Sequence, residues 1–426
     1  MEVILRILIF AIALYGLSFL FIYSHNKNVQ AIKYSSNMVI KKQVVKVAQI
    51  VGARPQFIKY SPISQAIDRF NSSGKVIENI LIHSGQHYDY TMSDIFFNEL
   101  GIKEPQYHLG VGSGSHGIQT GHILQRAEEV LLKEKPDLLL VYGDTNTTLG
   151  GALAAVKLLI PVAHIEAGLR SYNKYMPEEV NRILTDHSSS VLFCPTEAAV
   201  ENLRKEGFRF MVNEGKPLDR NFNLSSYAAH LTNPLVFNVG DVMYDALLSS
   251  VEIAAEKSHI LENLDLAQKE YSLLTLHRAE NTNNCEKLEG IIDFVNDVSA
   301  GKTVIFPVHP RAINALNLTR KTFADNVKHI KPVGYFDMVW LLKNSARIFT
   351  DSGGLQKEAY WLKIPCITLR DETEWIETVQ SGWNILYRDY KGTHNPSDTD
   401  VFLYGNGKAA EKIVDIIVKY ENRLFS

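Results

Sequence analysis

Between residues 46 and 405, short apolar runs rich in β-branched residues alternate with longer segments of helical periodicity. The short runs are continuously apolar, which is typical of strands buried on both faces of a parallel sheet. The longer segments are typical of amphipathic helices that cover such a sheet. Ten predicted strands follow from this pattern, at residues 47–51, 79–83, 137–142, 162–166, 191–195, 272–276, 303–307, 329–333, 347–350 and 366–369. The pattern therefore predicts the α/β fold class.

Ten strand–helix units divide most naturally into two doubly wound, Rossmann-like domains. We place the first domain at residues 46–238 and the second at 239–405, followed by a terminal helical segment at 406–426. A polar stretch at 209–234 interrupts the alternation and is interpreted as an insertion. Doubly wound sheets bind ligands at the carboxyl ends of their strands, so we expect a site in a cleft between the two domains.

The N-terminal segment has a different character. Residues 3–23 are apolar apart from Arg6, and at 1.5 Å per residue they give a helix of roughly 30 Å, enough to cross a bilayer. Several lysines follow this run, and the next acidic residue is Asp68. Because positively charged flanks stay on the cytoplasmic side, the sequence predicts a transmembrane anchor at 1–45 and a cytoplasmic body after it. No Ala-x-Ala site follows the run, which disfavours a cleaved signal peptide. The alternative is that translation starts at Met38, which gives a cytoplasmic protein without an anchor.

Composition narrows the function classes. Apolar residues make up 46% of the chain and charged residues 21%, which excludes disordered, collagen-like and coiled-coil proteins. A net charge of −3 gives no basic excess for a nucleic-acid partner. The cysteines, Cys194, Cys285 and Cys366, are too far apart for a disulfide framework or a Cys-x-x-Cys zinc site. The 14 histidines form no His-Glu-x-x-His or His-x-His motif, so no metal site is expected.

Polar residues gather just after the predicted strands. Any one of them could be a helix cap or a satisfied core polar group, but their recurrence at so many strand ends indicates a binding site. The groups are Gly52-Ala53-Arg54-Pro55 with Lys59, Gly85-Gln86-His87, Gly143-Asp144-Thr145, His164 to Arg170, His277-Arg278, His309-Pro310-Arg311 and Asp351-Ser352-Gly353-Gly354.

The last of these groups is typical of a phosphate site. Glycines between a strand and a helix let backbone N–H groups approach an anion, although an N-capped glycine turn would look the same. Glu358 could reach a ribose diol or could be an ordinary surface residue. Arg54, Arg182 and His277 could neutralise a diphosphate. No strand is followed by Gly-x-Gly-x-x-Gly or by a P-loop, which disfavours nicotinamide dehydrogenases and P-loop NTPases.

Three carboxylates are candidates for acid–base chemistry. Asp144, Glu166 and Glu178 each follow a strand or lie in a loop of the first domain. Removing a proton and returning one requires paired carboxylates of different pKa. The structural alternatives are an Asx turn for Asp144 and a first-turn helix position for Glu178, after Pro177.

The motifs resemble one known family. They are Gly52-Ala-Arg-Pro55, Ser84-Gly-Gln-His87, Tyr142-Gly-Asp-Thr145, His164-Ile-Glu-Ala-Gly-Leu-Arg170, Pro177-Glu-Glu-Val-Asn-Arg182, Leu276-His-Arg-Ala-Glu-Asn281 and Thr350-Asp-Ser-Gly-Gly354. In this order they resemble the non-hydrolysing UDP-N-acetylglucosamine 2-epimerases. The resemblance implies a GT-B-like pair of domains, with the last helix packed back on the first. It also implies interconversion of UDP-N-acetylglucosamine and UDP-N-acetylmannosamine without metal or nicotinamide, by a homodimer.

The same resemblance implies residue roles. The family eliminates UDP across C1–C2 of the sugar and adds it back after a proton reaches the opposite face of C2. By motif position, Asp144 and Glu178 form the acid–base pair, Glu166 supports them and His277 stabilises the departing UDP. The implied UDP-sugar ligands are Arg54, Lys59, Gln86, His87, Arg182, Arg278, Ser352, Gly353, Gly354, Glu358 and Arg370.

Three features depart from the family pattern. The anchor and the 209–234 insertion are not usual features of the family. Residues 112–117 replace a segment that, in many bacterial members, binds a second UDP-N-acetylglucosamine molecule as an activator. Residues 374–377 contain Trp375, as in relatives that act on UDP-2,3-diacetamido-2,3-dideoxyglucuronate, so that sugar is an alternative substrate. A GT-B glycosyltransferase and a non-catalytic sugar-nucleotide sensor are the rival classes, although neither needs all three carboxylates.

Overall fold

The structure is a computed structural model that describes residues 44–74, 76–86, 102–213, 216–217, 234–394, 396 and 403–419. The chain divides into two units, Met1–Val44 and Val45–Ser426. The predicted anchor and His87 lie outside the described residues, as does most of the predicted insertion. Across the described ranges, no helix is both long enough and apolar enough to span a bilayer.

The first domain is built on a nine-stranded sheet in the order β3-β2-β1-β4-β5-β6-β9-β7-β8. Strand β4 pairs in parallel with β1 and with β5, and β6 pairs in parallel with β5 and β9. The strands are β1 (Val44–Val51), β2 (Val76–His83), β3 (Tyr107–His108), β4 (Leu138–Tyr142), β5 (Val162–Ile165), β6 (Val191–Cys194), β7 (Phe210–Asn213), β8 (Lys216–Pro217) and β9 (Leu235–Asn238). The helices are α2 (Arg54–Asn71), α4 (His116–Glu134), α5 (Asn146–Lys157), α6 (Pro177–Ser188) and α7 (Glu197–Lys205).

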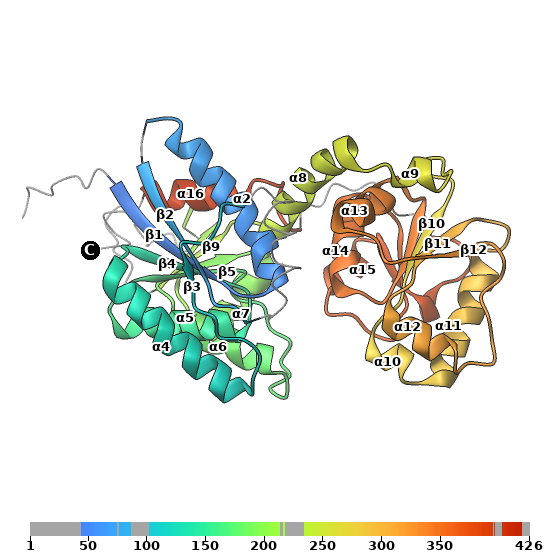
Figure 1. The fold of residues 1–426 in the computed structure, drawn as a ribbon, viewed down its shortest axis with the longest axis horizontal. Helices are drawn as coiled ribbons and strands as arrows, with labels where there is room; N and C mark the ends of the chain where they lie inside the picture. The colour runs from blue at the N-terminus through green and yellow to red at the C-terminus, as the bar shows by residue number, and fades with distance from the viewer. Residues whose placement is uncertain are drawn as a thin grey trace, which may run out of the picture. The chain divides into compact units, whose positions relative to one another are not determined.

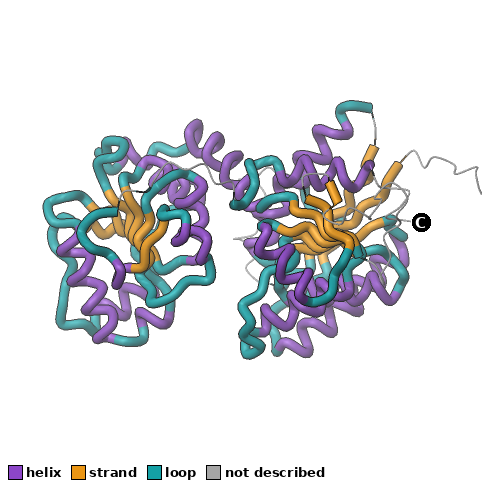
Figure 2. Tube along the Cα trace, turned by 180° about the vertical axis from the view of Figure 1, so that it is seen from behind, coloured by secondary structure: helices purple, strands orange, loops and turns teal. Residues whose placement is uncertain are grey.

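The second domain has a six-stranded sheet in the order β12-β11-β10-β13-β14-β15, with every neighbouring pair parallel. The strands are β10 (Ser272–Thr275), β11 (Val304–Pro307), β12 (Val327–Ile330), β13 (Arg347–Thr350), β14 (Cys366–Thr368) and β15 (Asn384–Leu386). The helices are α8 (Val242–Lys257), α9 (Ile260–Asn263), α10 (Ala279–Thr282), α11 (Cys285–Val298), α12 (Pro310–Leu316), α13 (Tyr335–Asn344), α14 (Gly353–Trp361) and α15 (Ile376–Gln380). A 3₁₀ turn, η2 (Tyr387–Asp389), follows β15. Figures 1 and 2 show helices around each sheet.

Strand β4 shows why these runs are continuously apolar. Leu138, Leu140 and Tyr142 pack into the core on the α2 side of the sheet. Leu139 and Val141, which point the other way, pack into a separate core with side chains of α4 and α5. Successive side chains of a strand face opposite sides of the sheet, so a strand covered on both faces places apolar side chains on both. The predicted α/β class with two parallel sheets is confirmed.

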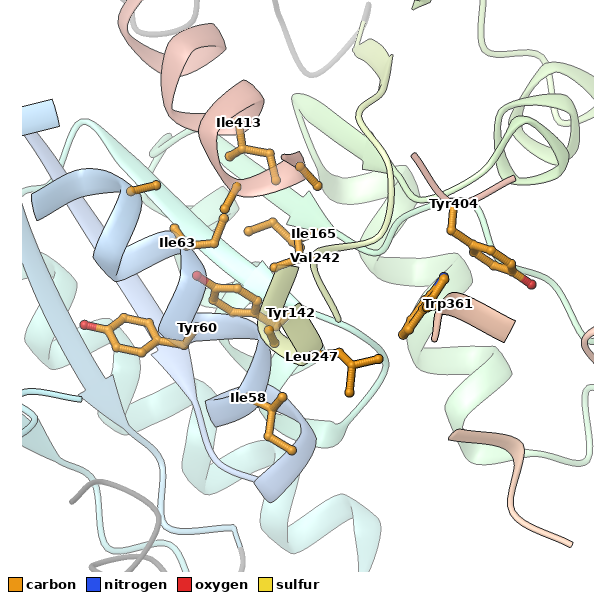
Figure 3. Close-up of a cluster of buried hydrophobic side chains, with 14 of the residues drawn as sticks. Ile58, Tyr60, Ile63, Tyr142, Ile165, Val242, Leu247, Trp361, Tyr404 and Ile413 are labelled. Carbon is orange, nitrogen blue, oxygen red and sulfur yellow. The ribbon is translucent and has the colours of Figure 1, made fainter. Parts of the chain in front are cut away.

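Helix α16 (Ala409–Lys419) packs against α2 and α8. Asp245 of α8 accepts hydrogen bonds from the backbone N–H groups of Ala409 (3.1 Å) and Ala410 (2.8 Å), which fixes the start of α16. Ile413 of α16 belongs to the same hydrophobic cluster as Ile63 of α2 and Val242 of α8 (Figure 3). The last helix of the chain therefore contributes to the core beside the first sheet.

Candidate active site

The turns that follow β1 and β4 are joined by one buried side chain, Gln56. Its Oε1 accepts hydrogen bonds from the N–H groups of Gly52 (2.8 Å) and Ala53 (3.1 Å), and its Nε2 donates to the carbonyl of Tyr142 (2.8 Å). Gly52 has no room for a side chain, because a Cβ there would lie 1.9 Å from Ser84 Oγ. Gln56 was not predicted from the sequence, because a glutamine that follows Pro55 gives no sign of this contact.

Lys59 of α2 and Glu166 after β5 form a largely buried ion pair, with 2.6 Å between Nζ and Oε2. Glu166 has a φ of 75°, a left-handed conformation that costs a non-glycine residue energy and is common at functional sites. Burial raises the pKa of Glu166, but Lys59, Lys357 and Arg182 outweigh it and lower the pKa. Burial likewise lowers the pKa of Lys59, and Glu166 reverses the effect. Both groups are therefore charged at neutral pH.

Asp144 lies beside this pair and forms an ion pair with a residue of α6. Arg182 Nη2 is 2.5 Å from Asp144 Oδ2, and Arg182 Nη1 is 2.5 Å from Glu179 Oε2. Glu179 is buried and also accepts the N–H groups of Ser171 and Tyr172, both at 2.9 Å. Of the two neighbouring glutamates, Glu179 thus organises the loop.

Glu178 is exposed in the first turn of α6. Its carboxyl group is thereby open to solvent, unlike that of its buried neighbour.

Gln86 follows β2 and faces the start of α5. Its Oε1 accepts hydrogen bonds from Thr147 N (3.0 Å) and Thr147 Oγ1 (2.7 Å). Arg54, at the first position of α2, is exposed. Both residues therefore lie with Asp144 and Glu166 at the carboxyl ends of the first sheet's strands.

In the second domain, Asp351 organises the end of β10. This fully buried carboxylate accepts the N–H groups of His277 (3.0 Å) and Arg278 (2.8 Å) and lies 3.1 Å from His277 Nδ1. Burial raises the pKa of Asp351, but its hydrogen bonds to His277 and Arg278 outweigh burial and lower the pKa. The ionised carboxylate orients the His277 ring, whose side chain is 40% exposed.

The start of α14 has the features of an anion site. Ser352 caps the helix. Its Oγ accepts a hydrogen bond from the backbone N–H group of Leu355, with 3.5 Å between the nitrogen and the oxygen. Around Gly353, a Cβ would meet Glu374 Oε1 at 2.5 Å and Trp375 Nε1 at 3.1 Å. Glu374 Oε2 lies 2.7 Å from Arg370 Nη1, and its Oε1 lies 3.5 Å from Arg278 Nη2. Two guanidinium groups thus flank the first turn of the helix.

Further along α14, Lys357 and Glu358 differ in their partners. Lys357 Nζ lies 2.9 Å from Asp241 Oδ2 and 4.2 Å from the centre of the Trp375 ring, a cation–π distance. Burial raises the pKa of Glu358 to about 7, against the opposing effects of Lys357 and Arg54. Glu358 therefore changes its charge near neutral pH.

Two sets of chemical groups result. Carboxylates and cations meet at the carboxyl ends of the first sheet, where a small pocket is lined in part by Lys59, Glu166 and Asp241. A helix N-terminus flanked by arginines and by His277 lies at the corresponding end of the second sheet. The first set suits proton transfer and the second suits a phosphate group. Among the described residues, no cluster of three or more histidine, cysteine or acidic side chains could hold a metal ion.

Comparisons with known proteins agree with this chemistry. Residues 71–418 match the model of the family described as UDP-N-acetylglucosamine 2-epimerase. A UDP-N-acetylglucosamine 2-epimerase homolog from Methanococcus maripaludis is 49% identical over 387 residues, 88% of this chain and 99% of the relative. A UDP-2,3-diacetamido-2,3-dideoxy-D-glucuronate 2-epimerase from Pseudomonas aeruginosa is 43% identical, covering 88% of this chain and 100% of the relative.

A solved structure is also similar. The UDP-GlcNAc 2-epimerase from Methanocaldococcus jannaschii, in complex with UDP-GlcNAc and UDP, superimposes with a TM-score of 0.67 at 42% identity. The match covers 88% of this chain and 100% of that structure. The two-domain GT-B-like architecture expected from the sequence is therefore confirmed.

Proposed function

The chain belongs to the UDP-N-acetylglucosamine 2-epimerase family and is an isomerase, and we propose how its residues interconvert UDP-N-acetylglucosamine and UDP-N-acetylmannosamine. The observation that carries the proposal is the pairing of Asp144 with Arg182, next to the Lys59–Glu166 ion pair. These groups lie at the edge of a sheet where parallel α/β domains bind ligands.

In the first half of the reaction, one carboxylate takes the proton from C2 while the bond from C1 to the UDP oxygen breaks. The C2–H electron pair becomes the C1–C2 double bond of a 2-acetamidoglucal, and UDP leaves with the C1–O pair. The N–H groups at the start of α14, with Arg278 and Arg370, bind the diphosphate. His277, oriented by Asp351, stabilises the charge that develops on UDP.

In the second half, the other carboxylate delivers a proton to the opposite face of C2 and the UDP oxygen bonds to C1 again. We assign these two steps to Asp144 and Glu178, with Glu166 as an electrostatic support. The exposure of Glu178 is compatible with a side chain that reaches the sugar from the far side. No electrons are gained or lost overall.

Isotope exchange tests this mechanism. Incubation with UDP-N-acetylglucosamine in D₂O should give a product that carries deuterium at C2, read by NMR. Asp144→Asn and Glu178→Gln should each slow the exchange by on the order of 10²–10⁴. The matched control is Glu197→Gln, since Glu197 is also exposed in the first turn of a helix, α7. Epimerisation with C2 fully protiated would refute the mechanism and both carboxylate roles.

The same incubation separates the rival classes. A glycosyltransferase transfers the sugar to an acceptor, and a sensor binds UDP-sugar without turnover. A second substrate, UDP-2,3-diacetamido-2,3-dideoxyglucuronate, is supported by the Pseudomonas aeruginosa relative and by Trp375 beside the α14 terminus. The ratio of kcat/KM for the two sugars decides between them.

We further propose a homodimer with its body in the cytoplasm, attached to the membrane through residues 1–45. The support is the apolar run at 3–23 followed by lysines.

A further inference from the structure

His164, at the end of β5, is fully buried, and both of its ring nitrogens face an oxygen. Nε2 lies 2.7 Å from the backbone carbonyl oxygen of Gly143, and Nδ1 lies 2.6 Å from Asp186 Oδ1. A carbonyl oxygen can only accept a hydrogen bond, so Nε2 must carry a proton. The charge of the ring then depends on which atom carries the proton between Nδ1 and Asp186.

Asp186 keeps its negative charge. Its Oδ2 accepts hydrogen bonds from Arg170 Nη1 (2.7 Å) and from Gly168 N (3.1 Å). The guanidinium of Arg170 and the N–H group of Gly168 stabilise the carboxylate anion independently of His164. An ionised carboxylate can only accept, so the second proton is on Nδ1.

The groups around the ring form an alternating chain of charges. Arg170 Nε lies 2.7 Å from Glu206 Oε1, so the chain from His164 to Glu206 alternates cation and anion. With Asp186 ionised, a neutral imidazole would place the lone pair of Nδ1 against Asp186 Oδ1, 2.6 Å away, and leave two carboxylates sharing one guanidinium. Cys194 faces Asp186 from β6 as a neutral thiol, because burial raises its pKa.

We propose that His164 donates a hydrogen bond from each ring nitrogen and acts as a positioning residue for the acid–base carboxylates. It binds the carbonyl of Gly143, which immediately precedes Asp144, and it lies two residues before Glu166. Through Asp186 it also holds α6, whose first turn carries Glu178. The role of the carboxylates rests on the proposed function, whereas the charge of the ring does not.

Neutron diffraction tests the charge directly on the whole protein. In crystals grown in D₂O near neutral pD, we expect deuterium on both Nδ1 and Nε2 of His164, and none on the carboxyl group of Asp186. Deuterium on only one ring nitrogen, or on Asp186, would overturn the assignment. The measurement does not depend on activity.

Kinetics test the positioning role. His164→Gln can donate to only one of the two oxygens, so kcat should fall by on the order of 10² through misplacement of the carboxylates. The dissociation constant for UDP should rise much less than kcat falls, because the main diphosphate groups lie at the start of α14 and only Arg182 lies on α6. The control is His259→Gln, a substitution of an exposed side chain.

A folded His164→Gln protein with kcat within about twofold of the wild type would overturn the positioning role, as would an equal loss of UDP affinity. If that variant does not fold, isosteric Asp186→Asn carries the same test. Wild-type protein that catalyses no C2 exchange would instead refute the proposed function, and the neutron result would still decide the charge of the ring.

Discussion

His277 is held at the end of β10 by Asp351, which accepts both its backbone N–H and lies 3.1 Å from its ring. We expect His277→Asn to fold normally and to lower kcat by on the order of 10², because it removes a group that stabilises UDP as it departs. Steady-state kinetics and thermal melting measure the two effects. His122→Asn, an exposed position on α4, is the control. An unchanged kcat would give His277 a structural role only.

Glu358 should make both UDP affinity and the stability of the fold depend on pH. The pKa of Glu358 is about 7 in the folded protein, above the usual value of 4.5. The free energy of unfolding should therefore fall as pH rises from 4.5 to about 7, because only the unfolded chain ionises readily in that range. The family resemblance implies that Glu358 accepts hydrogen bonds from UDP, and the ionised form accepts them best, so UDP affinity should increase as pH rises through about 7. Glu358→Gln should weaken UDP binding about tenfold at pH 8, with a smaller loss at pH 6.

The apo protein should show the opposite effect of the same substitution. Glu358→Gln should melt higher than the wild type at pH 8 and equally at pH 4.5, because glutamine carries no charge to bury. Calorimetry of UDP binding and of unfolding, with Glu286→Gln at an exposed position as control, measures both. A wild-type affinity that does not vary between pH 6 and 8 would contradict this role.

Candidates for the chemistry could be selected from the sequence, whereas the residues that hold these candidates in place could not. Asp144 and Glu166 stand out because packing alone does not select a carboxylate after a buried strand. Gln56 and Asp186 lie within helices, where polar residues are ordinary. Their function depends on distances to Gly52 and His164 across the fold, which a single sequence does not contain.

At the scale of elements, the predicted strands correspond to strands of the structure. The run at 347–350 coincides with β13, and 329–333 overlaps β12 (Val327–Ile330) by two residues. β7 was missed because it lies within the polar stretch interpreted as an insertion. Phe210 to Asn213 pair in parallel with β9 on one side and antiparallel with β8 on the other. The local pattern fails there because the apolar run, Phe210 to Val212, is only three residues long and polar residues follow it.

The first turn of α14 offers a matched pair of glycines. Gly353→Ala should weaken UDP binding about tenfold or more, since its Cβ would displace Glu374 and Trp375 from positions 2.5 and 3.1 Å away. Gly354→Ala should be tolerated, because its Cβ would meet only Ser352 Oγ, at 3.9 Å. Both keep the backbone N–H groups that bind the anion. Isothermal titration with UDP measures the difference, and equal affinities in the two variants would contradict the packing argument.

At the scale of the whole molecule, the two sheets have the same order of central strands. The central strands of both follow the order third-second-first-fourth-fifth-sixth within their domain, which is the Rossmann order. Each sheet therefore gathers the loops after its strands at one edge. The division of labour between the edges is a property of the side chains, with carboxylates on the first domain and an anion cradle on the second. The order of the motifs along the sequence predicts this division, and the isotope-exchange and UDP-binding experiments test it.

The N-terminal segment should not be needed for folding or catalysis. Every candidate site residue lies in the unit Val45–Ser426, which is compact in its own right. A chain that starts at Met38 should therefore fold and retain the kcat of the full chain in buffer without detergent. The full chain should sediment with membranes, whereas the shortened chain should remain in the supernatant. Loss of activity on truncation would show that residues 1–37 do more than attach the protein. Equal distribution of both chains in the supernatant would favour Met38 as the start of the functional protein.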